Sequence, residues 1–208
     1  MTFTIHTNSA AISVKPMLEP ITSLAFSVQS GKGVYALLLG SGLSRAARIP
    51  TGWEVTLDLI RQTAAIAGDG AEQDPETWYR NHFHAEPDYS RLLDSLGKTP
   101  SDRVNLLSRY FEPSQSEIEQ GEKLPTAAHK AIARLIGKGY FRVIITTNFD
   151  RLLEQALEAS GISPTIISTP DALKGALPLT HARCTIIKIH GDYRDTRIKN
   201  TADELGAC

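Results

Sequence analysis

The stretch FRVIITTNFDRLLEQALEASGISPTIIS, residues 141–168, decides the fold. Residues 141–146 and 163–168 contain β-branched and apolar runs and predict strands, while residues 149–159 predict a helix between them. Consecutive strands that are joined by a helix lie parallel in one sheet, with a right-handed crossover. The stretch therefore predicts one strand–helix–strand unit of a parallel α/β sheet.

Two more strands are expected beside this unit. Residues 34–39, VYALLL, are almost continuously apolar, and residues 184–189, CTIIKI, are apolar and β-branched. The helices predicted elsewhere span residues 17–29, 52–67, 89–96, 101–111 and 127–137. The fold class we predict is α/β, a Rossmann-like doubly wound parallel sheet.

The middle third of the chain departs from the alternation of strands and helices. Residues 68–88 predict an irregular excursion with one short helix, and residues 112–126 predict a polar linker. We expect the helical stretch, about residues 72–137, to be an insertion that forms a smaller lobe. The polar, aperiodic residues 1–16 are expected to be an N-terminal arm, so the domain covers residues 17–208.

The composition excludes several classes of protein. The 208 residues carry a net charge of −1, which gives no global bias toward nucleic acid or an anionic membrane. The sequence has no signal-peptide pattern and no long apolar run that could span a membrane. Its only cysteines, Cys184 and Cys208, cannot form a four-cysteine zinc module. A reducing, cytoplasmic location is expected.

The first candidate motif is the turn after residues 34–39. Gly40 and Gly42 permit a tight turn and close approach of the backbone to a pyrophosphate, and Ser41 and Ser44 add hydroxyl donors. Arg45 stands where a dinucleotide turn would have its third glycine, and its guanidinium could pair with phosphate. A simple glycine turn between a strand and a helix is the equally open alternative.

The second and third motifs also follow predicted strands. In TTNFD, Asn148 and Asp150 are either helix caps or groups that orient a water, a loop or a ribose hydroxyl. In IHG, Gly191 lets the chain turn away, so that His190 stands at the edge of the crevice as a candidate general base. Because ligands bind at the carboxyl ends of parallel strands, all three motifs are expected to meet in one crevice.

In this order, the motifs GSGLS, TTNFD and IHG resemble the G-A-G-x-S, T-Q-N-x-D and H-G segments of the sirtuin (silent information regulator two) superfamily, over about residues 34–192. The resemblance implies that NAD+ binds as substrate and that its nicotinamide–ribose bond is broken. It implies a catalytic group of Asn148, Asp150 and His190. The NAD+-binding residues that it implies are Gly40, Ser41, Gly42, Ser44, Arg45, Thr147 and Gly191.

Two differences from protein-deacylating sirtuins bear on which activity is expected. The zinc module is missing, and IPTGW at residues 49–53 stands where those enzymes continue toward a D-F-R segment. The pattern resembles bacterial sirtuin-like domains that hydrolyse NAD+ in anti-phage defence, which implies a metal-free NAD+ glycohydrolase. That resemblance also implies a homo-oligomer, or a fused or associated sensor module, as partner, with no membrane and no direct nucleic-acid binding.

Several alternatives stay open at this point. The chain could be a protein deacylase or ADP-ribosyltransferase, or a non-catalytic module that binds NAD+ or ADP-ribose. Related domains continue past the H-G segment, so we expect the domain to be incomplete at its C-terminal end: a fragment, a natural truncation, or half of a site. His82 and His84, with Glu86 and Asp88, could be metal ligands, but no further Cys or His has convincing spacing.

Overall fold

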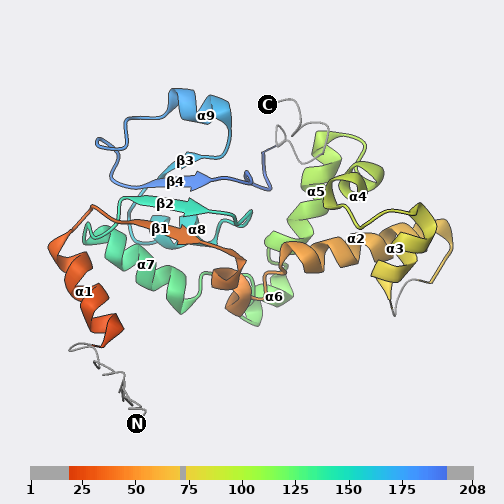
Figure 1. Cartoon of the computed structure of the whole chain (residues 1–208), viewed down its shortest axis with the longest axis horizontal. Coiled ribbons are helices and arrows are strands. Elements are labelled where there is room, and N and C mark those ends of the chain that lie inside the picture. The colour runs from red at the N-terminus through yellow and green to blue at the C-terminus, as the bar shows by residue number, and fades with distance from the viewer. Residues whose placement is uncertain (1–18, 71–73, 196–208) are drawn as a thin grey trace, which may run out of the picture.

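Four short parallel strands form the sheet, in the order β1-β2-β4-β3 (Figure 1). The computed structural model describes residues 19–70 and 74–195, so the expected arm at residues 1–16 lies outside the described residues. The strands are β1 (Ala36–Leu39), β2 (Val143–Thr146), β3 (Thr165–Ile167) and β4 (Thr185–Lys188). In the register, Leu39 pairs with Thr146 and Thr146 with Lys188, so three strands end at the same level. The predicted Rossmann-like α/β fold is confirmed.

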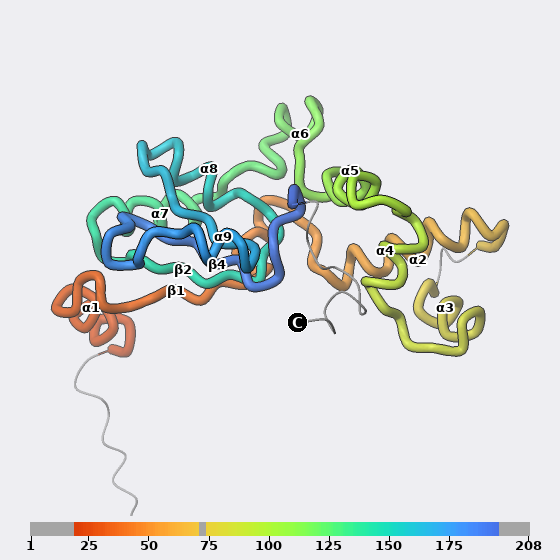
Figure 2. The backbone as a smooth tube through the Cα atoms, turned by 90° about the horizontal axis from the view of Figure 1, so that it is seen from above, coloured from red at the N-terminus to blue at the C-terminus, as the bar shows by residue number. Residues whose placement is uncertain are grey.

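Two helices, α7 (Ala127–Gly137) and α8 (Leu152–Glu158), lie on the same side of the sheet (Figure 2). Side chains alternate along a strand, and Ile144 and Ile186 are fully buried in the hydrophobic cluster that these helices share with the sheet. The remaining helices near the sheet are α1 (Pro20–Ser30) and α9 (Pro170–Gly175). Packing against α7 and α8 therefore determines which face of the sheet carries the buried apolar side chains.

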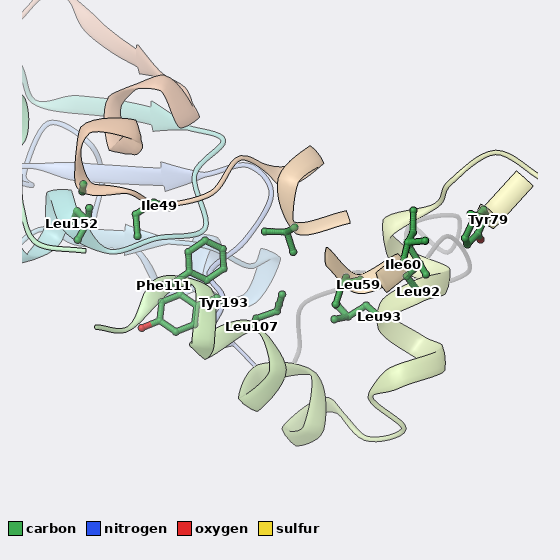
Figure 3. Close-up of a cluster of buried hydrophobic side chains, with 12 residues drawn as sticks. Ile49, Leu59, Ile60, Tyr79, Leu92, Leu93, Leu107, Phe111, Leu152 and Tyr193 are labelled. Atoms are coloured by element: carbon green, nitrogen blue, oxygen red, sulfur yellow. The ribbon is translucent and has the colours of Figure 1, made fainter. Parts of the chain in front are cut away.

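A second hydrophobic cluster belongs to a helical lobe and joins it to the sheet. Figure 3 shows the cluster running from Leu152 beside the sheet, past Phe111 and Tyr193, to Leu93 among the helices. The helices of the lobe that contribute to it are α2 (Gly52–Ala67), α3 (Pro75–Phe83), α4 (Tyr89–Leu96) and α5 (Pro100–Phe111). The lobe therefore includes α2, while α7, at the end of the predicted insertion, packs on the sheet.

Local sequence signals explain the bounds of the lobe helices. The Thr51 side chain and Glu54 form a reciprocal capping box at the start of α2, and Gly68, with φ of +81°, ends that helix in the left-handed conformation. The bounds of α2, α4 and α7 are as predicted. The linker at 112–126 contains one short helix, α6 (Gln115–Glu119), that its polar composition did not indicate.

The helix predicted from residue 149 was wrong at its start, because α8 begins at Leu152. The Asp150 carboxylate accepts a hydrogen bond from the Leu152 backbone amide. The carbonyls of Phe149 and Asp150 both accept hydrogen bonds from the Lys188 ammonium, and these contacts hold the residues before Leu152 as a loop.

Within residues 19–70 and 74–195, no helix is both long and apolar enough to cross a lipid bilayer.

The lobe core gives a first stability prediction. Leu59 in α2 is fully buried, and the Leu59→Ala substitution is expected to lower the free energy of unfolding by about 2–5 kcal/mol through lost burial and a residual cavity. Urea denaturation followed by circular dichroism measures the change. Ile66 on the same helix is 78% exposed, so Ile66→Ala is the matched control, expected to change stability by less than about 0.5 kcal/mol. Equal losses in both variants would contradict the packing described.

Candidate functional site

A cavity of about 260 Å³ opens beside the carboxyl ends of the strands, where the sheet meets the helical lobe. The residues that line it are Ser41, Ile49, Pro50, Gly52, Val55, Tyr89, Phe111, Thr147, Asn148, Phe149, Asp150 and His190. Each of the three motifs therefore contributes at least one residue to the same cavity. This is the location at which parallel α/β sheets bind their ligands.

Five of the predicted site residues do not line this cavity. They are Gly40, Gly42, Ser44, Arg45 and Gly191. The Ser41–Ala47 segment is a 3-10 helix, η1, in which Ser44 is fully buried and the exposed Arg45 lies 3.7 Å from the Glu54 carboxylate. Gly191 has φ of +84°, a left-handed conformation that glycine adopts without strain and that turns the chain after His190.

Asn148 is held by a buried hydrogen-bond network. Its Nδ2 donates to Ser44 Oγ and to Asp150 Oδ2, both at 3.2 Å, and the Ser44 hydroxyl donates to the same Asp150 oxygen at 2.7 Å. Reversing the amide would set its carbonyl oxygen against the carboxylate, so the contacts define its orientation. Asn148 Oδ1 is buried and has no hydrogen-bond partner, which leaves one unused acceptor on a residue of the cavity wall.

His129 in α7 contacts this network through Ser44, and none of the three sequence motifs predicted it. Its Nδ1 accepts from the Thr126 backbone amide at 3.2 Å, so the proton of the neutral ring is on Nε2, which lies 3.5 Å from Ser44 Oγ. Burial lowers the pKa of His129, an effect that the Asp150 carboxylate opposes. The signal in the sequence was its place three residues after Thr126, the N3 position of a capping box.

The lowered pKa of His129 gives a prediction for stability against pH. Below about pH 6.5 the unfolded chain binds a proton that the buried ring resists, so the free energy of unfolding is expected to fall between pH 7.5 and pH 5. In the His129→Gln variant this fall should be smaller, as measured by urea denaturation at both pH values. His181 is exposed, and His181→Gln should keep the wild-type difference; an unchanged fall in His129→Gln would contradict the assignment.

Lys188 at the end of β4 is a buried cation that the apolar reading of this strand overlooked. Its side chain is 1% exposed and forms ion pairs with Glu154 at 3.1 Å and Asp192 at 2.9 Å. Burial raises the pKa of Glu154, while the Lys188 charge opposes that shift. The signal available in the sequence was a single lysine inside an otherwise apolar strand, because a buried charge requires partners.

His190 stands at an aromatic wall of the cavity. Its exposed ring lies 6.2 Å from the Phe149 ring, which in turn is 6.4 Å from Tyr89 and 6.3 Å from Phe111. Burial raises the pKa of Tyr89, so its hydroxyl stays protonated at neutral pH. The sequence did not predict that Tyr89 of α4 and Phe111 of α5 line the cavity, because their position depends on how the lobe packs against the sheet.

His82 and Glu86, two of the residues considered as metal ligands, make other contacts. His82 stacks on Trp78 with ring centroids 4.8 Å apart, and Glu86 forms hydrogen bonds to the Arg80 guanidinium at 2.9–3.1 Å. Among the residues that the structure describes, no group of three or more His, Cys, Asp or Glu side chains is arranged to hold a metal ion.

Comparison with known proteins gives a match to a family model. No curated protein matches the chain. Residues 142–206 match the family model described as SIR2-like domain, a segment that contains Asn148, Asp150, Lys188 and His190 but not the glycine turn at residues 40–44. The chain from residue 142 to residue 206 is thus similar to the SIR2-like domain, which supports a relation to the sirtuin-like superfamily.

Proposed function

We propose that the protein is an NAD+ glycohydrolase, which uses water to convert NAD+ into nicotinamide, ADP-ribose and a proton. The match to the SIR2-like domain supports NAD+ as the ligand, since that family uses NAD+. The observation that carries the proposal is that Asn148, whose buried Oδ1 has no hydrogen-bond partner, lines the same cavity as His190. An oriented acceptor and an imidazole at one cavity are the groups that a hydrolysis of this kind needs.

The cavity suits the nicotinamide–ribose half of NAD+. Its volume of about 260 Å³ lies just under the range of roughly 300–1,000 Å³ usual for ligand pockets, so the rest of the dinucleotide must extend outside it. We assign the flat nicotinamide ring to the wall formed by Phe149, Tyr89 and Phe111. This wall excludes water from the leaving group, and the hydroxyls of Ser41 and Thr147 remain for polar parts of the ligand.

The proposed chemistry begins from the positive charge on the nicotinamide ring. As the bond from the ring nitrogen to the ribose breaks, its electron pair neutralises the ring and the ribose gains oxocarbenium character. Asn148 Oδ1 would accept a hydrogen bond from a ribose hydroxyl or from the attacking water. Oxygen of that water forms the new bond to the ribose carbon, and His190 takes the proton as general base. Asp150 and Ser44 hold the Asn148 amide in place.

The remaining binding residues, apart from Ser44, keep their assignments as proposals. Gly40, Gly42 and Gly191 would give room for the backbone near the diphosphate, and Arg45 would pair with it. The ion pair of Arg45 with Glu54 is exposed and 3.7 Å long, so exchanging it for a phosphate contact costs little. The Ser44 hydroxyl already donates to Asp150, which favours a supporting role for Ser44 over contact with phosphate.

A product assay tests the proposal. The full chain is incubated with NAD+, and chromatography is expected to show nicotinamide and ADP-ribose in equal amounts. Nicotinamide release that requires an acylated peptide would instead identify a deacylase, and release with transfer of ADP-ribose to protein would identify a transferase. Tight binding of NAD+ by calorimetry with no turnover would identify a binding module. Each of these three results would overturn the proposal.

We further propose a role in anti-phage defence, on the basis of the resemblance to bacterial sirtuin-like defence domains. In that setting the enzyme would act in the cytoplasm, as an oligomer or beside a sensor module, and would deplete NAD+ during phage infection. Measuring NAD+ in infected cells with and without the gene tests this extension. An unchanged NAD+ level in cells that carry the gene would contradict the defence role but not the enzymatic one.

A further inference from the structure

We infer that Lys188 is a positioning residue that holds the Asn148 loop and the His190 loop in one arrangement. The inference rests on the proposed function, because it assigns those two residues to one reaction. Lys188 itself does not line the cavity, so any effect on NAD+ cleavage must pass through the loops that it contacts.

The Lys188 ammonium lies between segments that follow different strands. Its Nζ donates to the carbonyl oxygens of Phe149 and Asp150, at 3.1 and 2.7 Å, in the loop after β2. It also donates to the Asp192 carboxylate at 2.9 Å, in the loop after β4, and to Glu154 of α8 at 3.1 Å. Four oxygens therefore surround a group that has three N–H bonds.

Because the Lys188 ammonium is buried, its contacts cannot be replaced by hydrogen bonds to bulk water. Lys188, Glu154 and Asp192 are each less than a tenth exposed, and Arg151 adds a second cation 3.7 Å from the Asp192 carboxylate. The two positive and two negative charges balance, which is what a buried cluster needs in order to be tolerated. Removal of the ammonium would leave carbonyl and carboxylate oxygens without their donor, so both loops would have to rearrange.

The position of these contacts links them to the proposed chemistry. Phe149 directly follows Asn148, and Asp192 lies two residues after His190, so one nitrogen atom restrains both groups through the adjacent backbone. A displacement of about 1 Å can lower a rate by about 100-fold when the reacting groups must be aligned. Loss of Lys188 is therefore expected to reduce the rate of the chemical step more than the affinity for NAD+.

The test uses a variant in which the charge balance is kept. The double variant Lys188→Met/Glu154→Gln removes the ammonium together with one carboxylate, and leaves Asp192 with Arg151. Glu154→Gln alone is the matched control, since it keeps the Lys188 contacts to both loops. Ile186→Ala, a change at a fully buried residue of the same strand, controls for a general loss of stability.

Two readouts are compared among these variants. In the double variant, we expect amide hydrogen exchange to become faster in residues 147–151 and in residues 189–193, and kcat for NAD+ to fall by about 10- to 100-fold with a smaller change in KM. Both controls should keep the wild-type exchange in these loops and a near wild-type kcat. Faster exchange in only one loop, or the same change in Ile186→Ala, would overturn the inference.

Hydrogen exchange does not depend on activity, which separates this inference from the proposed function. If the wild-type protein does not cleave NAD+, the proposed function fails, while the exchange data still show whether Lys188 joins the loops. If the wild-type protein cleaves NAD+ and the double variant has normal exchange and normal kcat, only the positioning role of Lys188 fails.

Discussion

The Asn148→Ala variant is expected to release nicotinamide from NAD+ about 10²- to 10³-fold more slowly than the wild-type protein, the usual cost of losing one oriented polar group at a reacting centre. The substitution removes the acceptor Oδ1, which is unpartnered in the structure, while the hydrogen bond from Ser44 to Asp150 remains. Steady-state kinetics at saturating NAD+ measure the loss. The fall should be in kcat, because in the proposed reaction this oxygen contacts the reacting ribose or water.

A second asparagine in the chain serves as the control for this variant. Asn105 is exposed on α5, and Asn105→Ala is expected to keep the wild-type rate. Thermal unfolding of both variants shows whether the Asn148 effect comes from loss of structure. A wild-type kcat in a folded Asn148→Ala variant would show that Oδ1 of Asn148 has no role in the reaction, and this would contradict the proposed function.

The His190→Ala variant is expected to lose about 10²- to 10⁴-fold in rate, the range typical of a general base. Because His190 is exposed, its removal should change the free energy of unfolding by no more than about 0.5 kcal/mol. Nicotinamide release and urea denaturation, measured on the same preparation, separate these two effects. A large loss of activity without a loss of stability is the pattern that supports a catalytic role.

His181 provides the matched control, because it is also an exposed histidine of the described residues. The His181→Ala variant should have wild-type kinetics. A small rate effect in His190→Ala would mean that another group takes the proton. Full activity in both Asn148→Ala and His190→Ala would refute the roles assigned to the two residues.

The arrangement of the strand ends could be predicted from the sequence because it depends on local patterns. Apolar runs that stop at GSG, TTN and IHG placed three motifs after three strands, and parallel pairing brings such ends together. Residues from all three motifs line one cavity. The starts of α2 and α7 were also predicted, and in the structure capping boxes at Thr51 and Thr126, which are contacts within one turn, define these starts.

The support of the site could not be predicted, because it depends on contacts between distant residues. Ser44 meets Asp150 across 106 residues of chain, and Lys188 meets Glu154 across 34. The apolar pattern of β4 does not show that Lys188 is buried with acidic partners. It also does not show that the contacts of Lys188 with Phe149 and Asp150 keep these residues outside α8. The aromatic wall depends on packing of the lobe, which no short motif encodes.

The cavity wall is divided between two hydrophobic clusters, and this has a consequence for heat inactivation. Phe111 belongs to the cluster that runs through the lobe, while Asn148 follows a strand that packs in the cluster beside α7 and α8. Separate parts of a protein open locally with different free energies. On warming, the less stable cluster will loosen first and separate the aromatic wall from the polar groups. The proposed cleavage of NAD+ is therefore expected to be lost at a lower temperature than the one at which the whole chain unfolds.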